Sequence, residues 1–463
     1  MNRINILRTR FFASLALGVA TLFSLRGEEQ DSFRNVTYSD LTIGAECQFP
    51  TEWSYSDCLE RAVKYNTDIR QTLLSILESD VDVEQAKDAW LPTVAFSSGQ
   101  GYTNYPVGVS SGSHNLYNSS YGVNAAWTVW EGNTRKYRLE TTRLVKRQQE
   151  LAGEGIITEL KIAILQAYLN ILYSREAIVI ARQTLETSST QTERMRKLVD
   201  AGRQSRVDLA QLESQTAQYR YNLTQAESSL AANKMNLKKI LVLGLETDIE
   251  IKGIDFPESE VTAPLPEMKQ TYMQALAWLP SFRSNTLSGE IYDYDIKIAE
   301  ATSTPEITLQ GGVGTGYTTG GRDWGYQMGH RLNENLNLSL NIPIYDANKR
   351  KRTVAKANLA RMEADIDRER LENDLSQTIE SLYIDLSNNR SKYESGKAQL
   401  TSMEETARLV DRQFELGLVN PLELLTAHNN LLNARLEQLQ NKYMAILTAK
   451  TIGYYATQQV SLP

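Results

Sequence analysis

An internal duplication constrains this chain more than any other feature of its sequence. The run Trp130-Glu-Gly-Asn133 matches Tyr345-Asp-Ala-Asn348, and Ala201–Leu209 matches Leu416–Leu424, each pair being 215 positions apart. Further upstream, Ala62 matches Ala275 and Pro92 matches Pro305 at an offset of 213. The two-residue difference therefore falls in the segment before Asn133, where a loop can absorb it. The chain is predicted to fold as two copies of one unit.

Apolar and small residues recur at alternating steps of four and three along the central part of each copy. A repeat of 3.5 residues predicts long helices that supercoil around each other. The stretch from Asn133 to Gly202 corresponds to roughly 100 Å of helix at about 1.5 Å per residue, and returning helices are expected after Gly202 and Gly417. The first copy has Leu160, Ile164, Ala167, Ile171, Ser174, Ile178, Ala181, Leu185, Ser188, Thr192, Met195 and Val199; the second has Leu375, Ile379, Leu382, Leu386, Asn389, Tyr393, Gly396, Leu400, Met403, Ala407, Val410 and Phe414.

A segment of different character precedes each long helix. Apolar residues alternate there with small or amide residues, most clearly in Asn335–Ile342 and its expected partner strand Glu306–Tyr317. Such alternation over about ten residues is typical of membrane barrel strands with a wet interior, and a soluble sandwich is the alternative. Four strands cannot close a barrel with a lumen, so the subunit is expected to oligomerise.

The N-terminus has the features of a secretory signal. Three arginines, Arg3, Arg8 and Arg10, precede the apolar run Phe11–Leu25, and cleavage after Ala20 or near Gly27 would fit; a single-pass anchor is the alternative. Residues 1–27 contain four arginines and no acid, so their removal changes the net charge from −7 to −11. An acidic chain argues against nucleic-acid binding.

The chain contains two cysteines, Cys47 and Cys58. An exported protein can oxidise them, and we predict a structural disulfide, with two buried thiols as the alternative. Neither the histidines, the acidic runs nor the glycine run Gly311–Gly316 has the spacing of a metal, nucleotide or catalytic motif. We therefore predict no enzyme activity, no catalytic residue, no cofactor and no metal.

The expected organisation follows the two copies. It comprises a signal peptide (1–27), an N-terminal segment (28–54), a first repeat (55–244), a linker (245–268), a second repeat (269–455) and a C-terminal tail (456–463). Each repeat is expected to contain a helix, a β-hairpin (93–130 or 306–345) and a long helical hairpin. The fold class is therefore mainly α with a small β part.

The order and spacing of these motifs resemble the TolC-like outer membrane efflux proteins. Both copies have a proline-initiated strand pair, a long helix and a turn of the form G-x-x-(S/N)-x-x-(D/E)-L. The resemblance covers roughly residues 55–455. It implies a homotrimer with a twelve-stranded transmembrane β-barrel in outer-membrane lipid and a helical tunnel in the periplasm. It also implies a periplasmic membrane fusion (adaptor) protein and an inner-membrane transporter as partners, in efflux or type I secretion.

The resemblance places the adaptor contact and the tunnel entrance at the hairpin turns. The implied docking residues are Gly202, Ser205, Val207, Leu209, Gly417, Leu418, Asn420, Leu422 and Leu424, and the implied entrance acids are Asp208 and Glu423. Helix capping is the alternative role for these two acids. The turns differ from TolC, because Val419 and Thr426 replace an arginine and an acid, while Arg203 and Arg206 lie in the first turn. The same gate salt bridges are therefore not expected.

Two other classes of protein are the alternatives. A soluble periplasmic adaptor would have one helical hairpin, and a structural coiled-coil protein would not explain the four strands or the signal. The transported substrate cannot be predicted, because in this architecture the inner transporter selects it.

Overall fold

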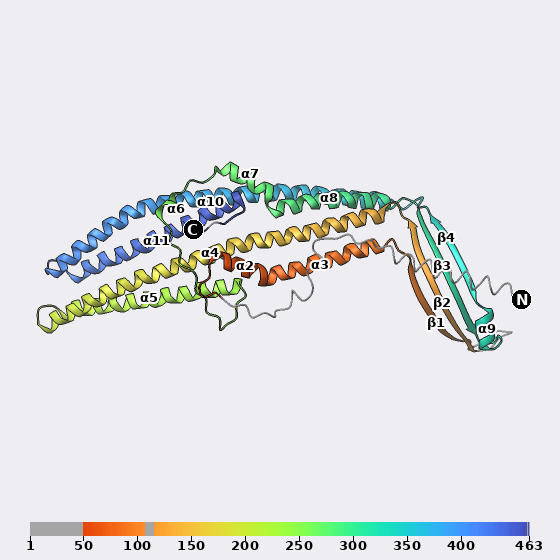
Figure 1. Ribbon diagram of the computed structural model, residues 1–463, viewed down its shortest axis with the longest axis horizontal. Coiled ribbons are helices and arrows are strands. Elements are labelled where there is room, and N and C mark those ends of the chain that lie inside the picture. Colours follow the sequence, from red (N-terminus) through yellow and green to blue (C-terminus); the bar gives the residue numbers. More distant parts are fainter. Residues whose placement is uncertain (1–49, 107–114, 461, 463) are drawn as a thin grey trace. The chain divides into compact units, whose positions relative to one another are not determined.

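The structure is a computed structural model that describes residues 50–106, 115–460 and 462. The first repeat contains α2 (Tyr55–Tyr65), α3 (Thr67–Asp88), β1 (Thr93–Asn104), β2 (Asn115–Trp130), α4 (Thr134–Asp200) and α5 (Arg206–Ile240). The second contains α7 (Met268–Trp278), α8 (Pro280–Ala301), β3 (Glu306–Thr318), α9 (Trp324–His330), β4 (Asn333–Asn341), α10 (Lys349–Glu415) and α11 (Pro421–Thr457). The short helix α6 (Glu258–Thr262) lies in the linker (Figure 1).

The helices of the two repeats keep the offsets of the sequence. Helices α3 and α8 have 22 residues each and begin 213 positions apart. Helices α4 and α10 have 67 residues each and begin 215 positions apart. The two-residue difference in length between the repeats therefore lies in the strand segments. The long helices of the two repeats have equal lengths, so equivalent residues keep equivalent positions along them.

Two helices, rather than the expected single one, precede the strands in each repeat. The break falls at Asn66 in the first repeat and at Leu279 in the second. The Asn66 side chain accepts the N–H groups of Asp68 and Ile69 and so caps α3, whereas α8 begins with Pro280, which has no N–H to leave unsatisfied. Different local chemistry produces the same break.

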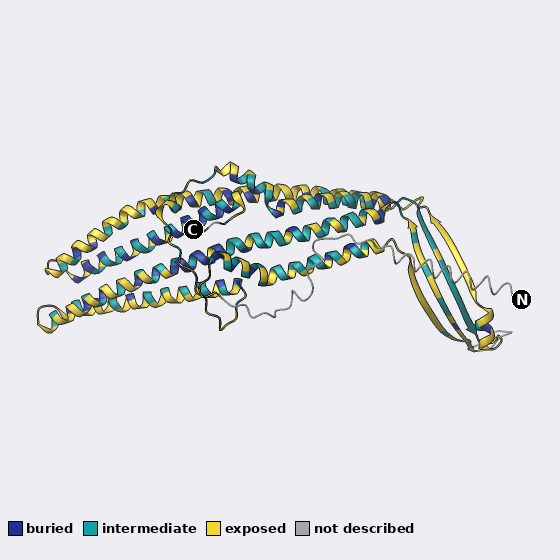
Figure 2. Ribbon diagram, in the orientation of Figure 1, coloured by how far each residue is buried: buried dark blue, intermediate teal, exposed yellow. Residues whose placement is uncertain are grey.

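The alternating stripe of the long helices is the buried side of each helix. On α4, nine of the twelve stripe residues are buried and the other three are half-buried (Figure 2). On α10, six are buried and six are half-buried. Helix α4 packs on α5 and helix α10 packs on α11, so each stripe lies against the returning helix of its own hairpin.

The four strands form one antiparallel sheet in the order β1-β2-β3-β4. One face carries exposed apolar side chains, among them Val94, Phe96, Leu336, Leu338 and Leu340. The opposite face is small and polar, because the register pairs Asn124 with Gly312 and Gly312 with Asn335. A Cβ at Gly312 would lie 2.7 and 2.8 Å from the two amide oxygens, so the glycine leaves room for both side chains. The edges β1 and β4 have no partner strand among the described residues.

Helix α9 lies between β3 and β4, where only a loop was expected. Its buried Gln327 accepts the N–H of Thr318 and donates to the Thr318 carbonyl, which satisfies the end of β3. The Gln327 amide therefore makes the two hydrogen bonds that the backbone of a neighbouring strand would otherwise make with Thr318. Such a long-range contact leaves no periodic signal in the sequence.

A duplicated pair of side chains fastens the linker to the long helices. In the first repeat, Tyr168 donates to the Lys252 carbonyl at 2.7 Å and Arg175 donates to the Ile251 carbonyl at 2.8 Å. Their equivalents 215 positions later, Tyr383 and Arg390, donate to carbonyls of the linker at Pro266 and Ala263. The seven-residue spacing puts tyrosine and arginine on one face of the helix. The linker is thus held to both repeats.

Cys58 is fully buried in the main core cluster, where burial raises the pKa of its thiol to about 12. Its predicted partner Cys47 lies outside the described residues, so the disulfide stays a prediction.

Helix α4 contains the longest apolar stretch among the described helices. By length and composition, an 18-residue window of α4 could cross a membrane, and 44% of this window is buried. Ile164, Leu165, Tyr168 and Ile171 are fully buried in the main core cluster. Packing within the chain accounts for this buried part of the apolar stretch.

Candidate functional site: the tips of the helical hairpins

Both long helices end in the same hydrogen-bonded turn. Gly202 and Gly417 have φ values of +71° and +75°, a region that side chains with a Cβ rarely adopt. At the first tip, Gly202 N–H donates to Val199 and Arg203 N–H to Leu198; at the second, Gly417 N–H donates to Phe414 and Leu418 N–H to Gln413. These paired bonds form a Schellman motif at each tip.

Polar side chains then start the returning helices. Ser205 accepts the N–H of Val207 at 3.0 Å, and Asn420 accepts the N–H of Glu423 at 2.9 Å. Pro421 occupies the first position of α11, where its missing N–H costs nothing. The motif G-x-x-(S/N) therefore encodes a helix stop followed after two residues by a helix start.

Replacement of Gly417 should loosen the second tip. Valine at φ +75° costs roughly 1–2 kcal/mol, whereas asparagine tolerates this region better. We expect Gly417→Val to increase hydrogen exchange in the last turn of α10 and to increase proteolysis at the tip, and Gly417→Asn to have a smaller effect. Nothing lies within 4 Å of a Cβ at this position, so equal protection in wild type and Gly417→Val would show that backbone strain does not act here.

The tip surface is apolar on the second hairpin. Leu418 and Leu422 are 71% and 65% exposed, and the neighbouring Leu416 is 61% exposed. On the first hairpin, Val207 is 65% exposed and lies between the exposed Arg206 and the half-buried Asp208. The exposed leucines are hydrophobic groups that a partner protein can cover.

Other residues of the turn motif are buried between the hairpins. Leu424 is fully buried in a cluster with Met195, Leu212, Val410 and Ala427, and Leu209 packs against this cluster. The cluster draws on α4, α5, α10 and α11, so it joins the two tips within one chain. Leu424 thus has no surface to offer a partner, and Leu209 has little.

Polar contacts also join the two hairpins close to the tips. Gln191 and His428 both contact Asp411 Oδ1, at 2.8 and 2.9 Å. Nearby, Arg194 and Arg412 donate to the two oxygens of Glu415 at 2.9 and 3.0 Å. These hydrogen bonds lower the pKa of the Glu415 carboxyl, that from Arg194 first. These residues could not be found from the sequence, because they lie off the apolar stripe and follow no motif.

The two entrance acids occupy equivalent positions in their helices. Asp208 and Glu423 are each the third residue of the returning helix, and Asp208 is half-buried while Glu423 is exposed. Glu423 lines a shallow groove of about 380 Å³ with Leu422 and Thr426. Neither carboxylate makes a hydrogen bond or an ion pair with another described residue, backbone contacts included. Both remain available to solvent or to a partner.

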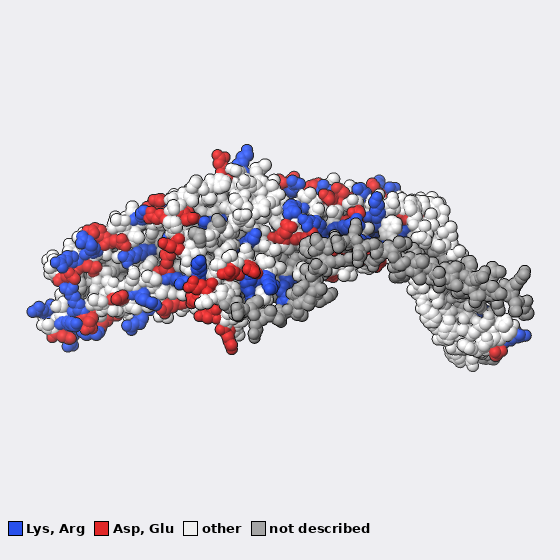
Figure 3. All heavy atoms as spheres, in the orientation of Figure 1, with Lys and Arg blue, Asp and Glu red and all other residues white. Residues whose placement is uncertain are grey.

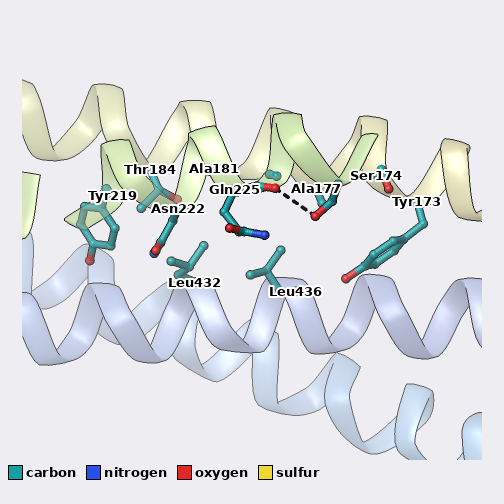
Figure 4. Close-up of a pocket in the computed structure, with 12 residues that line it drawn as sticks. Tyr173, Ser174, Ala177, Ala181, Thr184, Tyr219, Asn222, Gln225, Leu432 and Leu436 are labelled. Atoms are coloured by element: carbon teal, nitrogen blue, oxygen red, sulfur yellow. Dashed lines mark hydrogen bonds between the residues drawn. The ribbon is translucent and has the colours of Figure 1, made fainter. Parts of the chain in front are cut away.

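A second hollow lies further from the tips, between α4, α5 and α11. It encloses about 220 Å³ and is lined by small and apolar side chains, including Ala177, Ala181, Leu432 and Leu436, with Tyr173 and Tyr219 at its ends (Figure 4). No charged side chain lines it. Within the described ranges, no group of three or more His, Cys, Asp or Glu residues could hold a metal ion; His114 lies outside these ranges.

The comparison with protein families settles the class of the chain. The model of the outer membrane efflux proteins matches residues 58–242 and 271–451, one stretch in each repeat. The chain belongs to the outer membrane efflux protein family. This membership speaks against the soluble adaptor and the structural coiled-coil alternatives, and the matched family consists of efflux proteins rather than enzymes. No protein among those with curated functions matches the chain.

Solved structures of outer-membrane channels share the fold. The similarity to CusC has a TM-score of 0.70 at 18% identity and covers 93% of this chain and 99% of that chain. For the CmeC outer membrane channel of Campylobacter jejuni, the TM-score is 0.68 at 14% identity, over 93% and 94% of the two chains. For the outer membrane protein VceC of Vibrio cholerae, it is 0.69 at 12% identity, over 87% and 96%. The chain has the mainly helical fold of these channels, with a small sheet.

Proposed function

We propose that the chain is the subunit of a homotrimeric channel in the cell outer membrane, with the helical hairpins forming a tunnel in the periplasm. The channel gives passive export to substrates that an inner-membrane transporter delivers through a periplasmic adaptor, in an efflux or type I secretion system. Membership of the efflux protein family supports the outer-membrane role. The open edges of the sheet and of the packed helices support the closure of three subunits into a ring.

The observation that carries the proposal is that sheet and helices form rows in the same order, each with open ends. The sheet runs β1-β2-β3-β4. Beside it, α3 contacts α4, α4 contacts α8, and α8 contacts α10; further away, the row is α5, α4, α11 and α10. Unpaired strand edges favour association with another chain. When three copies join β4 to β1, α10 to α3 beside the sheet, and α10 to α5 further away, every row closes into a ring.

The two faces of the sheet then have distinct surroundings. The apolar face, with Phe96 at 70% and Leu336 at 78% exposed, suits outer-membrane lipid. The opposite face presents amides, hydroxyls and glycines and suits a water-filled lumen. Charged residues gather on the helices, and the visible face of the sheet is nearly free of them (Figure 3).

The hairpin tips supply the contact with the adaptor in this proposal. The docking surface consists of Val207, Leu418 and Leu422, supported by the turn residues Gly202, Ser205, Gly417 and Asn420. Leu209 and Leu424 support it from inside, since they pack between the hairpins. Asp208 and Glu423 lie at the same end and would ring the tunnel entrance.

Light scattering and bilayer recording test this function together. The protein purified in detergent from the outer-membrane fraction should have three times the mass of the mature chain, after correction for detergent. It should also conduct ions when inserted into a planar bilayer. A monomer or dimer, or a trimer without conductance, would overturn the proposal.

A further inference from the structure

The outer face of α3 is an unpaired seam of acidic and apolar side chains. Exposed residues follow one another at alternating steps of four and three: Leu74, Glu78, Val81, Gln85 and Asp88. Leu74 and Val81 are 48% and 66% exposed, and Asp82 is exposed beside Val81. The salt bridges of α3 use Asp80 with Lys146 and Glu84 with Lys87. Among the described residues, Glu78, Asp82 and Asp88 have no ion-pair partner.

The first turns of α10 carry the opposite charge. Lys349, Arg350, Lys351, Arg352 and Lys356 are exposed, and none forms an ion pair with a described residue. The first turn itself contains no acid. Asp346, just before the helix, accepts the backbone N–H of Arg350 at 2.7 Å but forms no ion pair with these five side chains. A second apolar seam continues from here, with Leu359, Met362 and Ile366 at 65%, 61% and 64% exposure. A cationic helix start beside an exposed apolar seam indicates a partner that supplies both acids and apolar surface.

A junction inside the chain shows how these two faces would meet. Helix α8 is the repeat equivalent of α3, helix α4 is the equivalent of α10, and α4 packs on α8. There, the rings of Tyr137 and Tyr294 lie 6.1 Å apart. Tyr137 corresponds to Arg352 at the offset of 215, and Tyr294 corresponds to Val81 at the offset of 213. A junction of the same kind between two copies places Arg352 of one subunit level with Val81 of the next.

That alignment brings unlike groups together along the seam. Glu78 and Asp82, which flank Val81, then lie within about one turn of Arg352 and Lys356, and Asp88 lies near Lys349. Leu74 lies near Met362, so apolar groups face each other further from the sheet. The internal junction has the tyrosine pair at this level and an ion pair, Arg283 with Glu154, further from the sheet. At the level of the tyrosine pair, the open edges carry complementary charges instead.

We propose that α3 of one subunit docks against the start of α10 of the next through this acid–base seam, and that the seam selects which edges join. Two acidic edges repel each other, as do two basic edges, so only the head-to-tail contact that closes a ring is favoured. The proposal rests on the homotrimer proposed above and identifies the residues that specify it. Anionic lipid headgroups are the other partner that the basic turn could bind, but they would leave the acids of α3 unmatched.

Charge reversal with rescue tests the seam. One variant carries Glu78→Lys, Asp82→Lys and Asp88→Lys; a second carries Lys349→Glu, Lys351→Glu and Arg352→Glu; a third combines all six. We expect each single-edge variant to lose at least ten-fold in trimer-to-monomer ratio at low salt, and the combined variant to recover most of it. The matched control is Arg368→Glu with Arg370→Glu, which reverses two exposed arginines of α10 paired within the helix.

The outcomes separate the alternatives. Recovery in the combined variant shows that both altered edges still fold, and circular dichroism of each single-edge variant checks this independently. Wild-type trimer levels in both single-edge variants, or no recovery in the combined one, would overturn the seam. Loss confined to the basic-edge variant, together with weaker binding to vesicles of anionic phospholipid, would assign the basic turn to lipid instead. A wild-type protein that is not a trimer would overturn the proposed function itself.

Discussion

A channel in which Leu418 and Leu422 are both aspartate should assemble normally in the outer membrane and export nothing. Both side chains are more than three-fifths exposed at the second tip and make no contribution to the buried tip cluster. Their replacement therefore leaves the folded subunit intact. A partner that covers them would lose roughly 1.5–3 kcal/mol for each leucine and would also have to bury two charges. We expect binding to fall by at least about a hundred-fold.

Site-specific crosslinking and an export assay measure this effect in the same cells. A photoreactive residue at Val207 should crosslink to the adaptor in the wild type and fail to do so in the double variant. The control is Leu418→Met with Leu422→Met, which keeps the apolar surface and should keep export. Heat-modifiable trimers on gels must be equal in all strains. Export at the normal level in the aspartate variant would mean that the adaptor docks away from the tips.

The long helices could be predicted from sequence because their burial follows one periodic rule. Every stripe residue from Leu160 to Val199 and from Leu375 to Phe414 is buried or half-buried. A helix with a 3.5-residue repeat has only one apolar side, so periodicity determines both the element and its packing face. The strands could be predicted for the same reason, because their apolar residues alternate with a period of two.

Elements that depend on single side chains could not be predicted in this way. Helix α9 exists where Gln327 completes the end of β3, and the breaks at Asn66 and Leu279 follow from one cap and one proline. The residues Tyr168 and Tyr383 did have a signal, since they are 215 positions apart. Their role was hidden because they bind the linker, which has no repeat.

The candidate site also has a part that the sequence predicts and a part that depends on packing. Gly202 and Gly417 could be found from sequence, since a glycine that ends a long periodic helix indicates a positive φ. The motif could not show which leucines of the turn are exposed. Leu422 and Leu424 are two positions apart on α11, and a helix places such positions on different sides. The packing of α4, α5 and α10 against α11 decides that Leu424 is buried and Leu422 is not.

The side-chain caps at the tips bear directly on the two entrance acids. The caps of the returning helices are Ser205 and Asn420, whose side chains accept backbone N–H groups. Asp208 and Glu423 are therefore not required as caps, although as first-turn acids they still interact favourably with the helix dipole by about 0.3–1 kcal/mol each. Three-fold symmetry in the proposed channel would place up to six of these carboxylates near the narrow end. Rings of carboxylates favour cations.

The double variant Asp208→Asn, Glu423→Gln should accordingly lose most of the cation selectivity of the channel. A unit charge about 4 Å from a permeating ion contributes about 1 kcal/mol even at the dielectric constant of water. Because it stabilises a cation and destabilises an anion by this amount, one such charge changes the cation-to-anion permeability ratio by roughly thirty-fold. The reversal potential across a planar bilayer in a salt gradient should move towards zero, and Glu423→Gln alone should produce part of this shift. Glu405→Gln serves as the control, because Glu405 is a surface carboxylate of α10 already paired with Arg408. An unchanged reversal potential in the double variant, accompanied by a lower melting temperature, would assign both acids to the helix dipole alone.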